Sequence, residues 1–72
     1  MPKGDIRKRF GVRLRQLRRQ RGYTQVQLAE HLGLDRSYIA DVERGNRNIS
    51  LMNLEVIAQG FGISLSRLLV KI

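Results

Sequence analysis

Two short helices joined by a tight turn are predicted over residues 24–45, and this segment constrains the fold more than any other. Thr24, followed three residues later by Gln27, forms a capping box that typically begins a helix. Gly33 supplies the left-handed residue that ends this helix, and Asp35 caps the next one. The inward apolar residues of the pair are Leu28, Ala29, Leu32, Leu34, Ile39 and Val42. This packing leaves the start of the second helix rigidly held and pointing outward.

Three further helices are predicted around this pair. A first helix should run from about Asp5 to Arg21 and end at Gly22. Its apolar face recurs at helical spacing through Ile6, Phe10, Leu14 and Leu17. Gly45 closes the third helix, and a polar loop, Asn46-Arg47-Asn48, follows it.

The C-terminal part of the chain predicts two more helices. Ser50 caps the fourth, which stops near Gly60-Phe61-Gly62, and Ser64 begins a short fifth. The inward residues of the fourth helix are Leu51, Leu54, Ile57 and Ala58, and the fifth carries Leu65, Leu68 and Leu69. Strands, repeats and linkers have no signal in the sequence. The predicted fold is all-α, with five short helices in a single domain over residues 1–72.

The charge of the chain points to an anionic partner. Fourteen Lys and Arg face six Asp and Glu, which gives a net charge of +8, and nine of the fourteen precede Gly22. Nucleic acid, an anionic membrane surface and an acidic protein all fit this balance. The predominance of arginine favours bidentate contact with phosphate or guanine, and the outward helix start suggests a probe for the DNA major groove.

Other function classes have little support in the sequence. Cysteine is absent, and the lone histidine, His31, lies on the polar side of its helix beside Glu30. A catalytic triad, a phosphate-binding glycine loop and metal-ligand spacing are all missing, so we expect no enzyme activity, cofactor, metal or small-molecule ligand. The sequence also lacks an export signal and the run of roughly 18 apolar residues that a membrane span needs, which predicts a cytoplasmic protein.

The chain resembles the phage repressor and Cro class of helix-turn-helix proteins over roughly residues 10–69. The likeness is carried by Leu14-Arg15-Gln16-Leu17-Arg18, Gly22-Tyr23-Thr24-Gln25, Leu28-Ala29, Leu32-Gly33, Ile39, Val42-Glu43-Arg44-Gly45 and Leu54, Ile57 and Ala58. It implies a compact lambda-repressor-like domain whose second and third helices form the helix-turn-helix.

Two stretches, 34–39 and 43–51, are similar to the controller proteins of restriction–modification systems. That resemblance implies a homodimer that binds near-palindromic DNA operators at its own promoter and times the endonuclease after the methyltransferase. RNA polymerase is a further candidate partner of such a regulator. An antitoxin-type autoregulator that binds a toxin protein is the alternative, and nonspecific coating of nucleic acid is a third possibility.

The resemblance places base contacts in the first turns of the third helix. Arg36 can fork onto guanine O6 and N7, and Ser37 can donate or accept at several bases. Asp41 can accept from cytosine N4, or it can instead orient Arg36 or Arg44, and we favour the orienting role.

Further residues are expected at the DNA backbone. Gln25 should clamp a phosphate at the start of the second helix. Tyr38 can bond phosphate or be partly buried, and these two readings stay open. The remaining candidates surround the loop after the third helix and are Arg44, Asn46, Arg47 and Asn48.

Two expectations concern structure rather than DNA. The family resemblance implies a partly buried ion pair between Arg18 and Glu43. The tail is too short to bury all its apolar residues within one protomer, which predicts a two-fold dimer interface. Its candidate residues are Phe61, Ile63, Leu65, Leu69 and Val70.

Overall fold

The computed structural model describes residues 4–72 and contains five α-helices. They are α1 (Ile6–Gln20), α2 (Gln25–Leu32), α3 (Arg36–Glu43), α4 (Leu51–Phe61) and α5 (Leu65–Leu68). Over the described range the structure has no strand, and the predicted all-α fold is confirmed. None of the helices in this range has the length and apolar character to cross a membrane.

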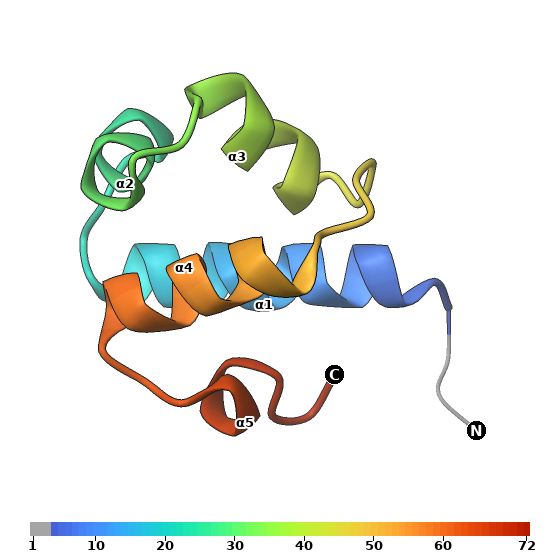
Figure 1. Cartoon of the computed structure of the whole chain (residues 1–72). Helices are drawn as coiled ribbons and strands as arrows, with labels where there is room; N and C mark the ends of the chain where they lie inside the picture. Colours follow the sequence, from blue (N-terminus) through green and yellow to red (C-terminus); the bar gives the residue numbers. More distant parts are fainter. Residues whose placement is uncertain (1–3) are drawn as a thin grey trace.

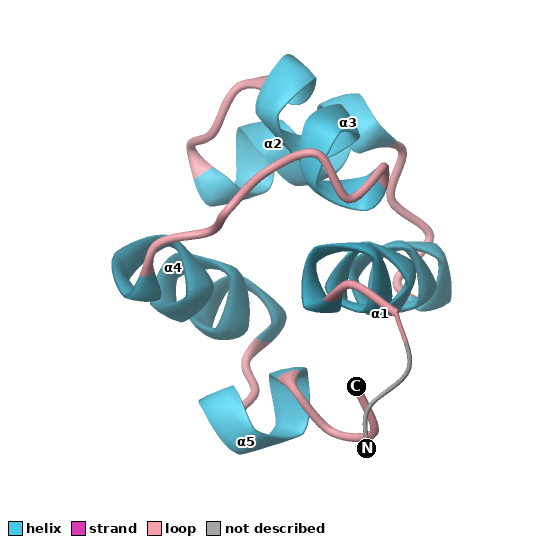
Figure 2. Ribbon diagram, turned by 90° about the vertical axis from the view of Figure 1, so that its right-hand side faces the viewer, coloured by secondary structure: helices cyan, strands magenta, loops and turns pink. Residues whose placement is uncertain are grey.

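The helices form three layers (Figures 1 and 2). The pair α2 and α3 lies on one side of the molecule, α1 and α4 form the middle layer, and α5 lies on the opposite side. Each helix contributes a side chain with no exposed surface to a common core, namely Leu14, Leu28, Ile39, Ile57 and Leu68. The core therefore joins all three layers and fixes α3 relative to the rest of the chain.

Local sequence explains most of the helix boundaries. Both hydrogen bonds of the predicted capping box are present between Thr24 and Gln27. Gly33 ends α2 in the left-handed conformation, with φ of 71°, which a residue with a Cβ adopts only at a cost. Asp35 occupies the cap position of α3, but its side chain makes no capping hydrogen bond, which corrects that expectation.

Helices α1 and α3 approach closely because position 11 is glycine. A Cβ on Gly11 would lie 2.5 Å from the backbone oxygen of Glu43 and 2.6 Å from that of Val42. Such distances are far inside van der Waals contact, so only glycine permits this approach. The contact secures the C-terminal end of α3 against α1.

Two residues expected in the core are exposed. Ile6 is 58% exposed and Leu51 is 79% exposed. Each is the first residue of its helix. Helical periodicity identifies the correct face but not how far along the helix the core extends.

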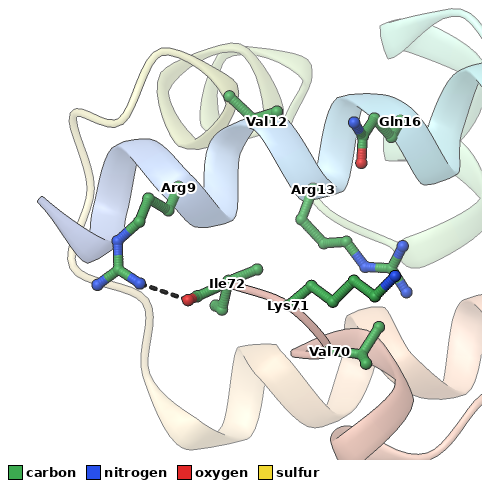
Figure 3. Close-up of a pocket in the computed structure, with 7 residues that line it drawn as sticks. All are labelled: Arg9, Val12, Arg13, Gln16, Val70, Lys71 and Ile72. Carbon is green, nitrogen blue, oxygen red and sulfur yellow. Dashed lines mark hydrogen bonds between the residues drawn. The ribbon is translucent and has the colours of Figure 1, made fainter. Parts of the chain in front are cut away.

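Arginines of α1, and Arg21 directly after it, secure the C-terminal part of the chain. Arg13 donates to the carbonyl oxygens of Leu68 at 3.1 Å and Arg67 at 2.7 Å. Arg21 donates to the carbonyl oxygen of Phe61 at 2.9 Å, and Arg9 donates to that of Ile72. Figure 3 shows Arg9 reaching Ile72, with Arg13 close to the same terminal segment. These side chains bind backbone oxygens in the last turns of α4 and α5 and at Ile72, and are not simply a solvated basic face.

Candidate nucleic-acid interface

The start of α3 presents two exposed polar side chains on a rigid support. Arg36 and Ser37 are the first two residues of the helix and are both exposed. The part of the chain that the structure describes gives neither side chain a hydrogen bond or ion pair. Ile39 and Val42, at most 1% exposed, bury the opposite face of the helix. The arrangement leaves an arginine and a hydroxyl free at a fixed helix end, which suits base recognition.

Asp41 lies one turn further along α3 and contacts two arginines. Its Oδ1 accepts a hydrogen bond from Arg44 Nη2, and its Oδ2 lies 3.7 Å from Arg47 Nε. Arg36 is not among its partners. Asp41 therefore orients Arg44 and Arg47 in the free protein, and its contact with a base stays a prediction.

Arg47 also rests on the ring of Tyr38. The guanidinium carbon lies 4.9 Å from the ring centroid, a cation–π distance. The Tyr38 hydroxyl accepts a hydrogen bond from Asn53 Nδ2 at 3.0 Å, so the half-buried ring is held from α4. Asn53 had no signal in the sequence, because its partner lies 15 residues away on another helix. Asn46 and Asn48 are exposed in the same loop.

Glu43 is a buried carboxylate that links three segments of the chain. Its side chain is 1% exposed, and Arg18 Nε donates to Oε2 at 2.6 Å. Its Oε1 accepts from Arg18 Nη2 at 3.1 Å, Gln25 Nε2 at 3.1 Å and Arg15 Nε at 3.4 Å. The Arg18–Glu43 ion pair is thus present, joined by two residues that were not expected in it.

These contacts determine the ionisation of Glu43. Burial raises the pKa of the Glu43 carboxyl, whereas hydrogen bonds from Arg18 and Gln25, the charge of Arg18 and the Arg15 hydrogen bond lower it. The net direction is down, so the pKa of Glu43 lies below its ordinary value of 4.5. Glu43 is therefore an anion at neutral pH and compensates the positive charge of its partners.

Gln25 begins α2 beside this carboxylate. Its amide nitrogen donates to Glu43, so in the free protein the side chain is held on the interior side of the interface. An amide nitrogen carries two hydrogens, and one of them stays available for a phosphate. The contact of Gln25 with a phosphate remains a prediction. Glu43 is the group that positions the Gln25 side chain.

The predicted dimer residues divide into exposed and buried members. Leu65, Leu69 and Val70 are 39%, 36% and 44% exposed, and Ile63 is half-buried. Phe61 is only 3% exposed because the last turn of α4 packs it into the core, so its side chain cannot form an interface surface. Leu69 also lines an apolar groove of about 300 Å³ with Ile6, Phe10, Ile49, Leu54 and Ile72. The groove extends the apolar surface of the tail toward the start of α1.

Comparison with known proteins agrees with this geometry. A helix-turn-helix family model matches residues 14–68. The control protein C.MunI of a Mycoplasma species is 46% identical over 65 residues, which cover 89% of this chain and 88% of that protein.

Solved structures give the same result. The restriction–modification controller protein C.AhdI from Aeromonas hydrophila is 46% identical, with a TM-score of 0.83 over 88% of this chain and 96% of that one. The controller protein C.Esp1396I, solved as a tetramer with its natural 35 base-pair operator, is 30% identical with a TM-score of 0.81, over 92% of this chain and 87% of that one. The predicted resemblance to restriction–modification controllers is confirmed. The chain belongs to the helix-turn-helix family of DNA-binding transcription regulators that includes these control proteins.

Proposed function

We propose that this chain is a sequence-specific transcriptional regulator of a restriction–modification system that binds near-palindromic duplex DNA as a homodimer at its own promoter. The observation that carries the proposal is the exposed Arg36 and Ser37 at the rigid start of α3, which have no partner within residues 4–72, in a chain similar to control proteins over most of its length. Base readout by these side chains would supply specificity, and the net charge of +8 would supply affinity for phosphate.

Dimerisation supports specificity because a two-fold axis presents two copies of α3 to one site. The exposed apolar side chains of the tail, Leu65, Leu69 and Val70, are the proposed contact surface. Two recognition helices would then lie about 34–36 Å apart, one turn of DNA. The cytoplasm is the proposed location and RNA polymerase a proposed further partner, since both follow from action at a promoter.

Selection from random duplexes with the purified protein, followed by a salt titration on the winner, tests this function. We expect the selected sequences to share a motif with two symmetric halves. The affinity should fall steeply as the salt concentration rises, because binding depends on several phosphate contacts. Recovery of no symmetric motif would contradict the proposal. The antitoxin alternative is not favoured by the similarities to control proteins, and the absence of a toxin gene beside this one would count further against it.

A further inference from the structure

Arg15 and Gln25 meet at a single buried oxygen atom. Arg15 Nε lies 3.4 Å and Gln25 Nε2 lies 3.1 Å from Oε1 of Glu43. Arg15 comes from α1 and Gln25 from the first turn of α2, so Glu43 places side chains of two helices next to each other. Gln25 is the residue expected at a DNA phosphate, and Arg15 had no role in that expectation.

Arg15 retains most of its hydrogen-bonding capacity. Its side chain is 43% exposed, and within residues 4–72 neither terminal nitrogen of its guanidinium has a hydrogen-bond partner. Arg18 differs, because it is 11% exposed and uses Nε and Nη2 on Glu43 and Nη1 on the carbonyl oxygen of Tyr23. Arg18 is therefore fully engaged inside the protein, whereas Arg15 presents a free fork of donors to solvent.

The charges of the cluster lead to the same conclusion. Glu43 contributes one negative charge, and Arg18 alone balances it at 2.6 Å. The charge of Arg15 is thus in excess, at the exposed edge of the cluster. An uncompensated guanidinium with two free nitrogens matches the geometry and charge of a phosphate group.

We propose that Arg15 is a phosphate ligand that acts together with Gln25, so that the two side chains hold one phosphate of the DNA backbone. Glu43 is the positioning residue, since it holds a donor of each while leaving their other donors free. This inference rests on the proposed function, because its ligand is the backbone of duplex DNA.

Two substitutions of Arg15 test the proposal. Arg15→Ala removes the side chain, and Arg15→Gln removes the charge but keeps an amide donor near Glu43. Arg67→Ala is the matched control, because it removes one exposed arginine from α5, in the layer opposite α2 and α3 (Figure 2). Fluorescence anisotropy would measure the affinity of each variant for the selected operator and for a scrambled duplex across a salt series.

We expect both Arg15 variants to bind operator and scrambled DNA about tenfold more weakly, since one charge-assisted contact is lost. The slope of log affinity against log salt should become shallower by about 0.9, the value for one phosphate contact. Arg67→Ala should change the salt slope by less than half of the change expected for the Arg15 variants. A purely structural role of Arg15 would lower the thermal midpoint and leave the salt slope unchanged, which would overturn the proposal.

A double-mutant cycle with Gln25→Ala tests whether the two residues share one phosphate. We expect the double variant to lose clearly less affinity than the product of the single losses, because either substitution already disrupts the shared contact. Strictly multiplicative losses would overturn the shared site. If the wild-type protein binds operator and scrambled DNA equally, the proposed function fails. If it discriminates between them while Arg15→Gln keeps the full slope, only this inference fails.

Discussion

At the scale of single residues, Glu43 connects the stability of the protein with its proposed DNA interface. The carboxylate is buried and accepts hydrogen bonds from Arg15, Arg18 and Gln25. Sequence similarity indicated only the Arg18 partner. The other two come from helices that meet at Glu43 only in the folded protein, so pattern alone could not identify them.

Glu43→Gln should lower the free energy of unfolding by about 3 kcal/mol at pH 7, because Arg18 would be left in a buried site without its counter-charge. The pKa of Glu43 in the folded protein lies below its ordinary value of 4.5. The unfolded chain therefore takes up the proton first, and stability contributed by the ionised carboxylate is present above about pH 4.5 and falls as the pH drops toward the folded pKa.

Urea unfolding from pH 7 to pH 3 would measure both effects. The difference between wild type and Glu43→Gln should shrink as the pH falls below about 4.5. Asp5 also has a lowered pKa, of about 2, chiefly because Arg7 donates a side-chain hydrogen bond to it, but both proteins share that residue. A difference that is independent of pH would contradict the assignment to Glu43.

Arg36→Ala should abolish discrimination at one base position and cost about 1–3 kcal/mol there. The reason is that Arg36 is exposed, lacks a partner within residues 4–72 and begins the helix expected to enter the groove. Competition binding with every single-base variant of the operator would measure this loss of base discrimination. Arg47→Ala is the comparison, since Arg47 is proposed to contact the DNA backbone and loss of such a contact would weaken all sequences alike. Equal weakening of all sequences by Arg36→Ala would instead favour nonspecific coating.

At the scale of elements, the contact between α1 and α3 determines where the recognition helix lies. It depends on Gly11, whose absent Cβ leaves room for the backbone oxygens of Val42 and Glu43. Glycine inside a helix reduces helix stability by roughly 1 kcal/mol relative to alanine, so local propensity argues against it. The close packing of α1 against α3, and not helix propensity, therefore explains why residue 11 is glycine.

Gly11→Ala should destabilise the protein by about 1–3 kcal/mol in spite of its better helix propensity, because the methyl group meets backbone that cannot rotate away. Thermal unfolding would measure this change. Val12→Ala, at the next and 56% exposed position, is the control and should change stability by less than about 0.5 kcal/mol. A stabilised Gly11→Ala variant would show that α1 and α3 separate easily.

The arginines of α1 show how charge can mislead at this scale. In sequence they form a basic face of an amphipathic helix, yet Arg9, Arg13 and, just after the helix, Arg21 each donate to a backbone oxygen in the C-terminal part of the chain. These partners are 40 to 63 residues away. Only the fold brings them together, and fewer arginines are therefore available for DNA than composition suggests.

At the scale of the whole molecule, the tail leaves apolar surface that one protomer does not cover. Leu65, Leu69 and Val70 are partly exposed beside the apolar groove that Ile6 and Leu69 line. Surface of this kind is typical of a contact with a second subunit. The interface itself remains a proposal.

Leu69→Lys should weaken dimerisation at least about tenfold, or 1.4 kcal/mol, because it places a charge within this surface. Sedimentation velocity over a range of concentrations would measure the dimer constant. The variant should then bind DNA with two half-sites no more tightly than DNA with one half-site. Met52→Lys is the control. Met52 is 79% exposed near the start of α4, at the end of that helix away from α5. Loss of dimers in the Met52 variant alone would place the interface there instead.

The sequence by itself determined the number of helices, most of their ends and the helix-turn-helix, because caps, glycines and apolar spacing act over a few residues. Thr24, Gly33 and Ser50 illustrate this local control. Tertiary structure alone decided that Phe61 is core and Leu51 is surface, and that Asn53 supports Tyr38. It also decided which arginines have no partner among residues 4–72, as is the case for Arg36. Those outcomes depend on contacts between residues distant in sequence, whose geometry exists only once the five helices have packed.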